Sequence, residues 1–456
     1  MKPRGPCGRL PVVDDLAALD HRHVWHPFTD MAAWVDDEPL IIDRAEGCWL
    51  YDSHGRRYLD GNASLWVNVH GHRRAELDDA IRTQLDRVAH TTFLGLSNPP
   101  AIELAARLTA LAPGELDRVF FSESGASAVE VALKMAYAYH LFRGEGHRSL
   151  FVSMDGAYHG DTVGSVSVGR VDVFHDTYRP LLFPTRGFAQ PYCYRCPLGL
   201  TYPVCDLACA DTLDDILARD GDRVAAVVVE PLVQGAAGII TAPDGHLRRV
   251  AEIARRHGVL LVADEVATGF GRTGTLFACE AEGVAPDLMA VGKSLTGGYL
   301  PMSATLATDE IFEAFTAGGH TFFHGHSYSG NPLAAAVALA NLDLFEADAT
   351  LTNARLLANV LATETARLTP LRPVGEIRQR GLMCGIELVE DRDTRRPFPA
   401  AARIGARVCR AAREQGLVIR PLGDTIVVMP ALAMQPDDVR FLVDVLIKCI
   451  SEIAGP

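Results

Sequence analysis

Several features that would assign the 456-residue chain to particular functional classes are missing from its sequence. No apolar run approaches the roughly 18 residues that a membrane-spanning helix needs. Basic residues are not in excess, since 43 Lys and Arg stand against 57 Asp and Glu, which gives a net charge of -14. We therefore expect neither nucleic acid nor an anionic membrane as partner, because no surplus positive charge neutralises phosphates. No apolar segment follows Lys2 and Arg4, so we expect no secretory signal.

The residues that are present indicate a globular protein with a large core. Hydrophobic residues make up 48% of the chain and charged residues 22%, and the length allows two or three lobes. Ten cysteines in a chain of this size are expected to be mostly reduced, in the cytoplasm. Four of them lie in one polar stretch and could bind a structural zinc, although their spacing is irregular: Cys193, Cys196, Cys205 and Cys209. We expect no metal in the reaction itself.

The stretch from 258 to 301 contains the strongest chemical signal. Two short apolar runs, 259–263 and 288–291, are typical of parallel strands buried on both faces. The first run is followed by Asp264 and the second by Gly292 and Lys293. Ligands of open α/β sheets bind just past the carboxyl ends of such strands. An aspartate and a lysine delivered to that edge suit pyridoxal phosphate, since the lysine forms the Schiff base and the aspartate faces the protonated pyridine nitrogen.

Other interpretations of this stretch exist. Gly292 and Lys293 could end a phosphate-binding P-loop, but that motif requires glycine where Asp287 stands. Lys293 could be a solvated surface lysine, although the apolar run before it and the Thr-Gly-Gly turn at 296–298 favour a ligand-facing position. Asp264 could simply cap a helix.

Three more segments end in polar or small residues after an apolar strand. Residues 118–122 lead into Gly125 and Ala126 and a helix to about 142, which suits a phosphate at the helix N-terminus or an ordinary capped helix. Residues 150–154 precede Tyr158, which could stack on a flat ring or belong to the core. Residues 224–229 end at Glu230. This alternation of strands and helices predicts a parallel, doubly wound sheet from about 115 to 300.

A long motif places these segments in a known family. Asp264-Glu265-Val266-x-Thr268-Gly269-Phe270-Gly271-Arg272-Thr273-Gly274, with Gly292-Lys293 further on, resembles the class III aminotransferases of the fold-type I pyridoxal-phosphate enzymes. The resemblance extends from about His23 to Ile447. It implies an α/β fold with a large domain, 76–345, built on a mostly parallel doubly wound sheet. A small α+β domain would be built from both chain ends, 23–75 and 346–456, after a loose N-terminal arm, 1–22.

The resemblance also implies roles for individual residues. Lys293, Asp264 and Tyr158 would be catalytic. Cofactor contacts would come from residues spread over the chain and, for the last two, from the neighbouring subunit of a homodimer: Gly125, Ala126, Tyr158, Glu230, Asp264, Lys293, His326 and Ser327. Substrate would meet residues from both chain ends as well, with a guanidinium binding its carboxylate: Leu65, Trp66, Tyr158, Lys293, Gly325 and Arg420. The partners implied are a small-molecule amino donor and a keto acid acceptor.

Shorter motifs resemble the branch of this family that acts in biotin synthesis, among them Trp25-His26-Pro27-Phe28-Thr29 and Tyr158-His159-Gly160-Asp161-Thr162. That branch aminates 8-amino-7-oxononanoate with S-adenosylmethionine or lysine as donor. Leu65, Phe28 and Tyr328 depart from the adenosylmethionine-dependent pattern and look more like the lysine-dependent members. An ω-amino acid or diamine–pyruvate aminotransferase is the alternative. A pyridoxal-phosphate isomerase or decarboxylase and a non-catalytic binding protein are more distant possibilities.

Overall fold

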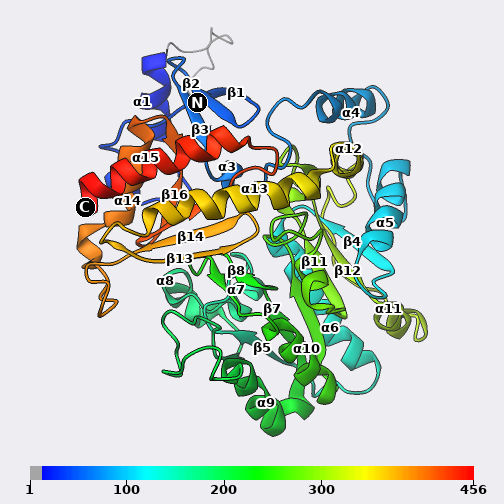
Figure 1. Ribbon diagram of the computed structural model, residues 1–456. Coiled ribbons are helices and arrows are strands. Elements are labelled where there is room, and N and C mark those ends of the chain that lie inside the picture. Colours follow the sequence, from blue (N-terminus) through cyan, green and yellow to red (C-terminus); the bar gives the residue numbers. More distant parts are fainter. Residues whose placement is uncertain (1–12, 456) are drawn as a thin grey trace, which may run out of the picture.

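The computed structural model describes residues 13–455 (Figure 1). The loose arm expected over 1–22 lies outside the described residues as far as residue 12. From there the chain differs from the expectation, since Val13–His23 form helix α1. Polar contacts to residues that follow the helix hold this segment: the Trp34 indole donates to Asp20 at 2.8 Å, and the His26 imidazole lies 2.9 Å from the other Asp20 oxygen.

A seven-stranded sheet forms the centre of the molecule, with the order β4-β12-β11-β10-β7-β5-β6. Six strands are parallel and β12 runs antiparallel to both of its neighbours. The bounds are β4 (Arg118–Ser122), β5 (Leu150–Met154), β6 (Thr185–Phe188), β7 (Val224–Val229), β10 (Leu260–Asp264), β11 (Leu288–Val291) and β12 (Ser303–Ala307). Each strand of the 258–301 stretch forms where its apolar run predicts it.

The sheet is covered on both faces. Successive residues of the buried strand β7 point to opposite sides, so Val227 and Val229 pack in one core and Ala226 and Val228 in the other. The helices of this part are α4 (Ala75–Leu85), α5 (Pro99–Leu111), α6 (Gly125–Phe142), α7 (Val163–Val168), α8 (Asp172–His175), α9 (Ala208–Asp220), α10 (His246–Arg256), α11 (Asp309–Thr316) and α12 (Pro332–Ala347). Helix α6 packs on five of the strands, β4, β7, β10, β11 and β12, and its N-terminus lies at the carboxyl ends of the four parallel ones.

Two four-stranded sheets lie where the two ends of the chain come together (Figure 1), and the first of them combines residues from both ends. One contains β1 (Ile42–Glu46), β2 (Trp49–Asp52), β3 (Arg57–Asp60) and β15 (Leu417–Val418). The other has the order β13 (Val374–Arg380), β14 (Met383–Leu388), β17 (Thr425–Val428) and β16 (Arg420–Leu422). The parallel pairing of β3 with β15 joins the N-terminal hairpin to the C-terminal segment. Helices α13 (Thr350–Thr365), α14 (Ile404–Glu414) and α15 (Pro436–Ala454) pack beside these sheets.

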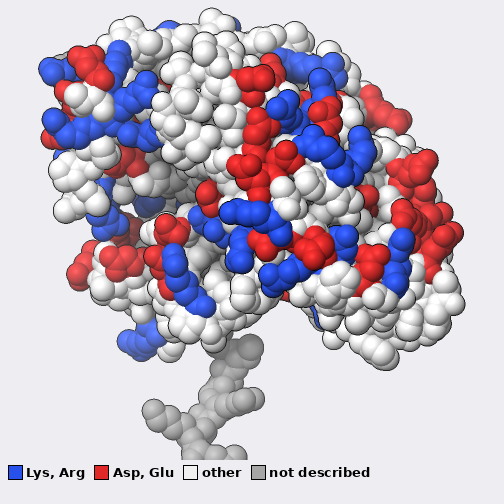
Figure 2. Space-filling model, turned by 90° about the horizontal axis from the view of Figure 1, so that it is seen from below, with Lys and Arg blue, Asp and Glu red and all other residues white. Residues whose placement is uncertain are grey.

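Short elements complete the described chain: helices α2 (Met31–Trp34) and α3 (Ala63–Trp66), strands β8 (Val233–Gln234) and β9 (Ile240–Thr241), and the 3₁₀ segments η1 (Asp176–Leu181), η2 (Gly221–Arg223), η3 (Ala278–Glu282), η4 (Lys293–Thr296), η5 (Ala366–Leu368) and η6 (Ala400–Ala402). Within residues 13–455 no helix combines the length and apolar character of a membrane span. Acidic and basic side chains are interspersed over the face shown in Figure 2.

Candidate active site

A cavity of about 480 Å³ opens at the carboxyl ends of β10 and β11. The register explains why it forms there, because Asp264 pairs with Ala290 and the two strands end side by side. Its walls bring together residues from six separate segments: Trp66, Gly125, Ala126, Tyr158, His159, Glu230, Ala236, Asp264 and Lys293. The cavity therefore contains most of the side chains that the sequence analysis singled out.

Lys293 follows β11 and is accessible only in part. Its backbone has a φ of 41°, a left-handed conformation that turns the chain sharply into η4. The Nζ atom lies 5.6 Å from the centre of the Trp66 ring. Removal from water lowers the pKa of the Lys293 amine, while the negative charges of Asp264 and Glu230 act in the opposite direction. The net effect is a pKa below the ordinary value of a lysine amine.

Asp264 ends β10 and forms a buried ion pair with His159. The His159 Nδ1 lies 2.7 Å from Asp264 Oδ2, and the Val266 N–H donates to Oδ1 at 3.1 Å. Burial opposes a charge on His159, but its hydrogen bond to Asp264 and the Asp264 and Glu230 charges outweigh that effect and raise the pKa of the imidazole. His159 was predicted to have no role of its own and was named only within the motif Tyr158-His159-Gly160-Asp161-Thr162. Its one signal was its place in the polar run after β5.

Glu230 joins two other segments of the wall. Its Oε1 accepts the N–H of Tyr158 at 3.0 Å and its Oε2 accepts the N–H of Gly235 at 2.9 Å. Burial raises the pKa of the Glu230 carboxyl to about 7, the positive charge of His159 opposes this, and the Asp264 charge adds to it. Glu230 thus fixes the backbone beside Tyr158, whose hydroxyl donates to Asp161 at 2.7 Å.

The N-terminus of α6 forms a polar cradle on the opposite wall. Ser124 caps the helix by accepting the Ser127 N–H at 3.2 Å, which leaves the first-turn amides of Gly125 and Ala126 without helical acceptors. Gly160, with a φ of 118°, approaches so closely that an added Cβ would lie 2.4 Å from the Ala126 Cβ. Donors of this kind at the N-terminus of an 18-residue helix suit a phosphate group.

Other predicted site residues lie outside the lining of this cavity. Leu65 is half-exposed and Arg420 is exposed on β16. Gly325 and Ser327 are exposed on the loop before α12, and His326 Nδ1 lies 3.4 Å from Glu123. These residues entered the prediction through the family resemblance, and within a single chain they do not line the cavity.

The four clustered cysteines surround a separate small cavity beside Tyr192 and Leu207. They are free thiols, and burial raises the pKa of Cys193 and Cys209. Within residues 13–455, no three His, Cys, Asp or Glu side chains are grouped in a way that could hold a metal ion.

A sheet with an aspartate and a lysine at adjacent strand ends, facing a helix N-terminus, defines an α/β enzyme site for a phosphate-bearing cofactor. The sequence profile of the class III aminotransferases matches residues 31–450, and the chain belongs to this family. The chain is 53% identical over 433 residues to an adenosylmethionine-8-amino-7-oxononanoate aminotransferase from Nitratidesulfovibrio vulgaris, covering 94% of this chain and 80% of that one.

Solved structures of transaminases share the fold. A crystal structure of adenosylmethionine-8-amino-7-oxononanoate aminotransferase from Methanocaldococcus jannaschii matches with a TM-score of 0.92 and 39% identity, covering 96% of this chain and 99% of that one. An amine transaminase from an uncultivated Pseudomonas species, in its pyridoxal-phosphate-bound form, matches with a TM-score of 0.90 and 38% identity, covering 94% and 99%. The predicted fold class, an α/β fold-type I transferase with a mostly parallel sheet, and the prediction of a transaminase are confirmed.

The cavity fits the cofactor that this family implies. The α6 cradle provides amide donors for a phosphate, Lys293 provides an amine, and Asp264 provides a buried carboxylate. The Nε2 atom of His159 is buried and has no partner among the described residues, so the His159 ring is held from one side by Asp264 alone. Val266 and Ala267 add a small apolar wall next to Asp264.

Proposed function

We propose that this protein is a pyridoxal-phosphate-dependent aminotransferase that converts 8-amino-7-oxononanoate to 7,8-diaminononanoate in biotin synthesis. The observation that carries the proposal is the convergence of Lys293 and the Asp264–His159 pair on one cavity at the ends of β10 and β11. The substrate is supported by the names of the Nitratidesulfovibrio and Methanocaldococcus proteins.

Some residues of the cavity would bind the cofactor, and others would transfer or hold a proton. The cofactor, when bound, supplies an aldehyde and an electron-withdrawing ring. Gly125 and Ala126 would hold its phosphate through their amides, and Tyr158 would stack beside the ring. Lys293 would anchor the cofactor and carry a proton on Nζ as an amine whose lowered pKa suits that task. Asp264, held by His159 at 2.7 Å, would keep a proton on the opposing ring nitrogen.

The remaining predicted residues suit a homodimer with shared active sites. His326 and Ser327 would reach the cofactor phosphate of the neighbouring subunit, and Gly325 would contact substrate. Large apolar side chains that would otherwise contact water support such an interface, since Trp25 is 88% and Phe323 is 87% exposed in the single chain. Leu65, Trp66 and Arg420 would bind substrate, with Arg420 receiving its carboxylate. We propose lysine or S-adenosylmethionine as donor.

We further propose a division into a large domain, 76–345, and a small domain built from 23–75 and 346–456. The pairing of β3 with β15 supports it. The described cysteines are all free thiols, which favours a reducing compartment, and we propose that the protein is cytoplasmic.

The test is product analysis by mass spectrometry. The purified enzyme with its cofactor is incubated with 8-amino-7-oxononanoate and one donor, which is lysine in one reaction and S-adenosylmethionine in another. The variant Lys293→Ala is the matched control. We expect the diamine product with one donor and none with the control. An enzyme that is silent with both donors but transfers amino groups from a simple amine to pyruvate would instead be an amine transaminase, as the similarity to the Pseudomonas structure would suggest.

A further inference from the structure

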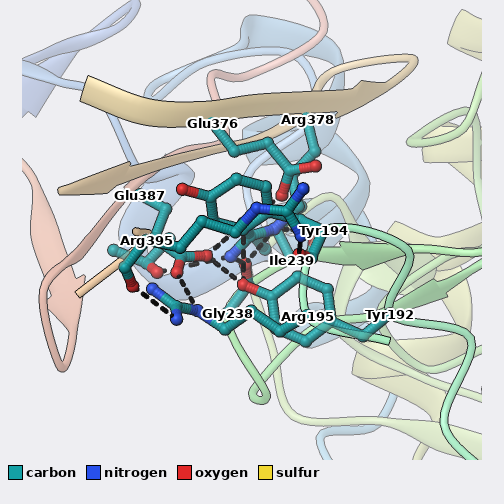
Figure 3. A network of polar contacts seen from close by, with 10 residues as sticks. Tyr192, Tyr194, Arg195, Gly238, Ile239, Glu376, Arg378, Glu387 and Arg395 are labelled. Atoms are coloured by element: carbon teal, nitrogen blue, oxygen red, sulfur yellow. Dashed lines mark hydrogen bonds and ion pairs between the residues drawn. The ribbon is translucent and has the colours of Figure 1, made fainter. Parts of the chain in front are cut away.

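A buried arginine lies behind one wall of the cavity, between the small C-terminal sheet and the large domain. Arg378 belongs to β13 and is only 6% exposed. Its Nη1 donates to Glu387 at 2.6 Å and to Glu376 at 2.8 Å. Tyr192 and Arg195, from the cysteine-bearing segment, bond to Glu387 from the other side (Figure 3). The two carboxylates compensate the buried guanidinium and fix its orientation.

The remaining N–H groups of the guanidinium form hydrogen bonds to the turn that connects β8 to β9, residues 235–239. Arg378 Nε donates to the carbonyls of Gly238 and Ile239, each at 3.0 Å, and Nη2 donates to Gly238 at 2.6 Å (Figure 3). Within the turn, the Gly238 and Ile239 N–H groups donate back to the Gly235 carbonyl at 3.2 and 3.0 Å. The turn packs against Gly385 of β14, and the hydrogen bonds that join it to the C-terminal sheet come from the Arg378 side chain.

The opposite side of the same turn forms part of the cavity. Ala236 lines it, and the Gly235 N–H bonds to Glu230 at 2.9 Å. An added Cβ at Gly235 would lie 3.0 Å from the Trp66 ring, so that ring rests directly on the glycine. The Trp66 ring in turn faces Lys293. A displacement of the turn therefore moves the Trp66 wall and the Glu230 carboxylate together.

We propose that Arg378 is a positioning residue for substrate, which sets the position of the 235–239 turn and, through it, of Trp66 and Glu230. Arg420 is on the same sheet as Arg378, at its edge strand β16, so one rigid sheet places both the proposed carboxylate receptor and the Trp66 wall. This inference rests on the proposed function, because it assigns Trp66 and Arg420 to the substrate.

The role requires an arginine in particular. Its planar fork donates to two carbonyls and two carboxylates at once, whereas a lysine ammonium has three donors on a flexible stem and lacks that fork. Lysine retains the charge that Glu387 and Glu376 need, so Arg378→Lys should keep the fold while it releases the turn. Arg380, two residues further along β13, is the matched control, because its one ion pair is to the exposed Asp244 at 2.8 Å.

The experiment measures KM and kcat for 8-amino-7-oxononanoate with the cofactor-loaded wild type, Arg378→Lys and Arg380→Met. We expect KM to rise about tenfold in Arg378→Lys with kcat changed less than about threefold, since the turn contacts the Trp66 wall directly, whereas Glu230 keeps its hydrogen bond to the Tyr158 N–H and the α6 cradle is not contacted. The visible absorbance of the bound cofactor should be unchanged, and Arg380→Met should behave as wild type. A merely structural role would lower the melting temperature or the active fraction without this split between KM and kcat.

Gly235→Ala provides a second variant that leaves Arg378 in place. Its added methyl group pushes on Trp66 from the turn, and it should raise KM in the same way. A KM within twofold of wild type in both variants refutes the positioning role, as does a loss of kcat and cofactor at unchanged KM. If Arg378→Lys fails to fold, the KM of Gly235→Ala decides. If wild type and Arg380→Met both convert 8-amino-7-oxononanoate, the proposed function holds. An unchanged KM in Arg378→Lys and Gly235→Ala then refutes only the positioning role of Arg378.

Discussion

Replacing Glu230 with glutamine should remove part of the pH dependence of the free energy of unfolding. Burial raises the pKa of Glu230 from its ordinary 4.5 to about 7. As pH rises from 4.5 to 7, the unfolded chain loses this proton while the folded chain keeps it. The folded state is therefore stabilised by proton binding at low pH and loses that stability as pH rises. The difference between the two pKa values corresponds to about 3 kcal/mol, of which about 2 kcal/mol falls between pH 5 and 7.

Glutamine at this position cannot ionise, but it also has one acceptor for two donors, the N–H groups of Tyr158 and Gly235. One amide loses its partner, which costs about 1–3 kcal/mol at every pH. The lost hydrogen bond lowers the free energy of unfolding equally at every pH, whereas the lost ionisation changes it with pH, so the two effects can be separated. Glu230→Gln should be less stable than wild type at pH 5, and its relative stability should improve by about 2 kcal/mol by pH 7.

The assay is urea unfolding of the cofactor-free protein from pH 5 to 7.5, for wild type and Glu230→Gln. An exposed glutamate on α5, Glu103, gives the matched control Glu103→Gln, for which the curve should follow that of wild type. Parallel pH curves for wild type and Glu230→Gln would refute the electrostatic account of the cavity.

Three further predictions concern the other groups. Lys293→Ala should abolish turnover, checked by product formation, while the circular dichroism spectrum stays that of wild type, because the lysine lies on a turn beside a cavity and not within a packed core. His159→Leu leaves Asp264 with the Val266 N–H as its donor and should destabilise the cofactor-free protein by about 2 kcal/mol. Since the pKa of His159 is raised, this loss should be largest below pH 6.5 and shrink as pH rises through the folded-state pKa, which urea unfolding across that range measures. Arg420→Met should raise KM for 8-amino-7-oxononanoate about tenfold or more and leave KM for the donor lysine less affected, checked by steady-state kinetics.

The strand ends that form the cavity were predictable because of how parallel sheets are buried. Runs such as 224–229 and 288–291 are apolar on both faces, and their ends must meet at one edge. Strand β12 was not predicted, because it contains Ser303 and Thr305. Their hydroxyls donate to carbonyls of Ser124 and Ala128 at 2.7 Å, so a buried strand has a polar sequence.

Partners distant in the sequence were beyond prediction. His159 and Asp264 are 105 positions apart, and no local pattern indicates that they touch. The hydrogen bonds from Arg378 to the carbonyls of Gly238 and Ile239 join two segments that meet only in the folded chain. Helix α1 is a related case, because Asp20 acquires its indole and imidazole partners from residues that follow the helix.

The substrate contacts were predicted on a different basis from the residues at the strand ends. Leu65 and Arg420 were named through a family resemblance, and the single chain places them outside the lining of the cavity. Local sequence determines which strand precedes Lys293, but it carries no information about the contacts that we propose for a second subunit and for the substrate.

The most direct test of the proposed reaction is a single-turnover absorbance measurement on the purified protein with its cofactor. Lysine, S-adenosylmethionine, alanine or a diamine is added separately, followed by 8-amino-7-oxononanoate. We predict that the visible band of the bound cofactor disappears with lysine or S-adenosylmethionine and returns with the keto acid. A band that responds only to alanine or a diamine and does not return with this keto acid would contradict the biotin-pathway assignment, and the absence of any visible band would contradict the role of Lys293.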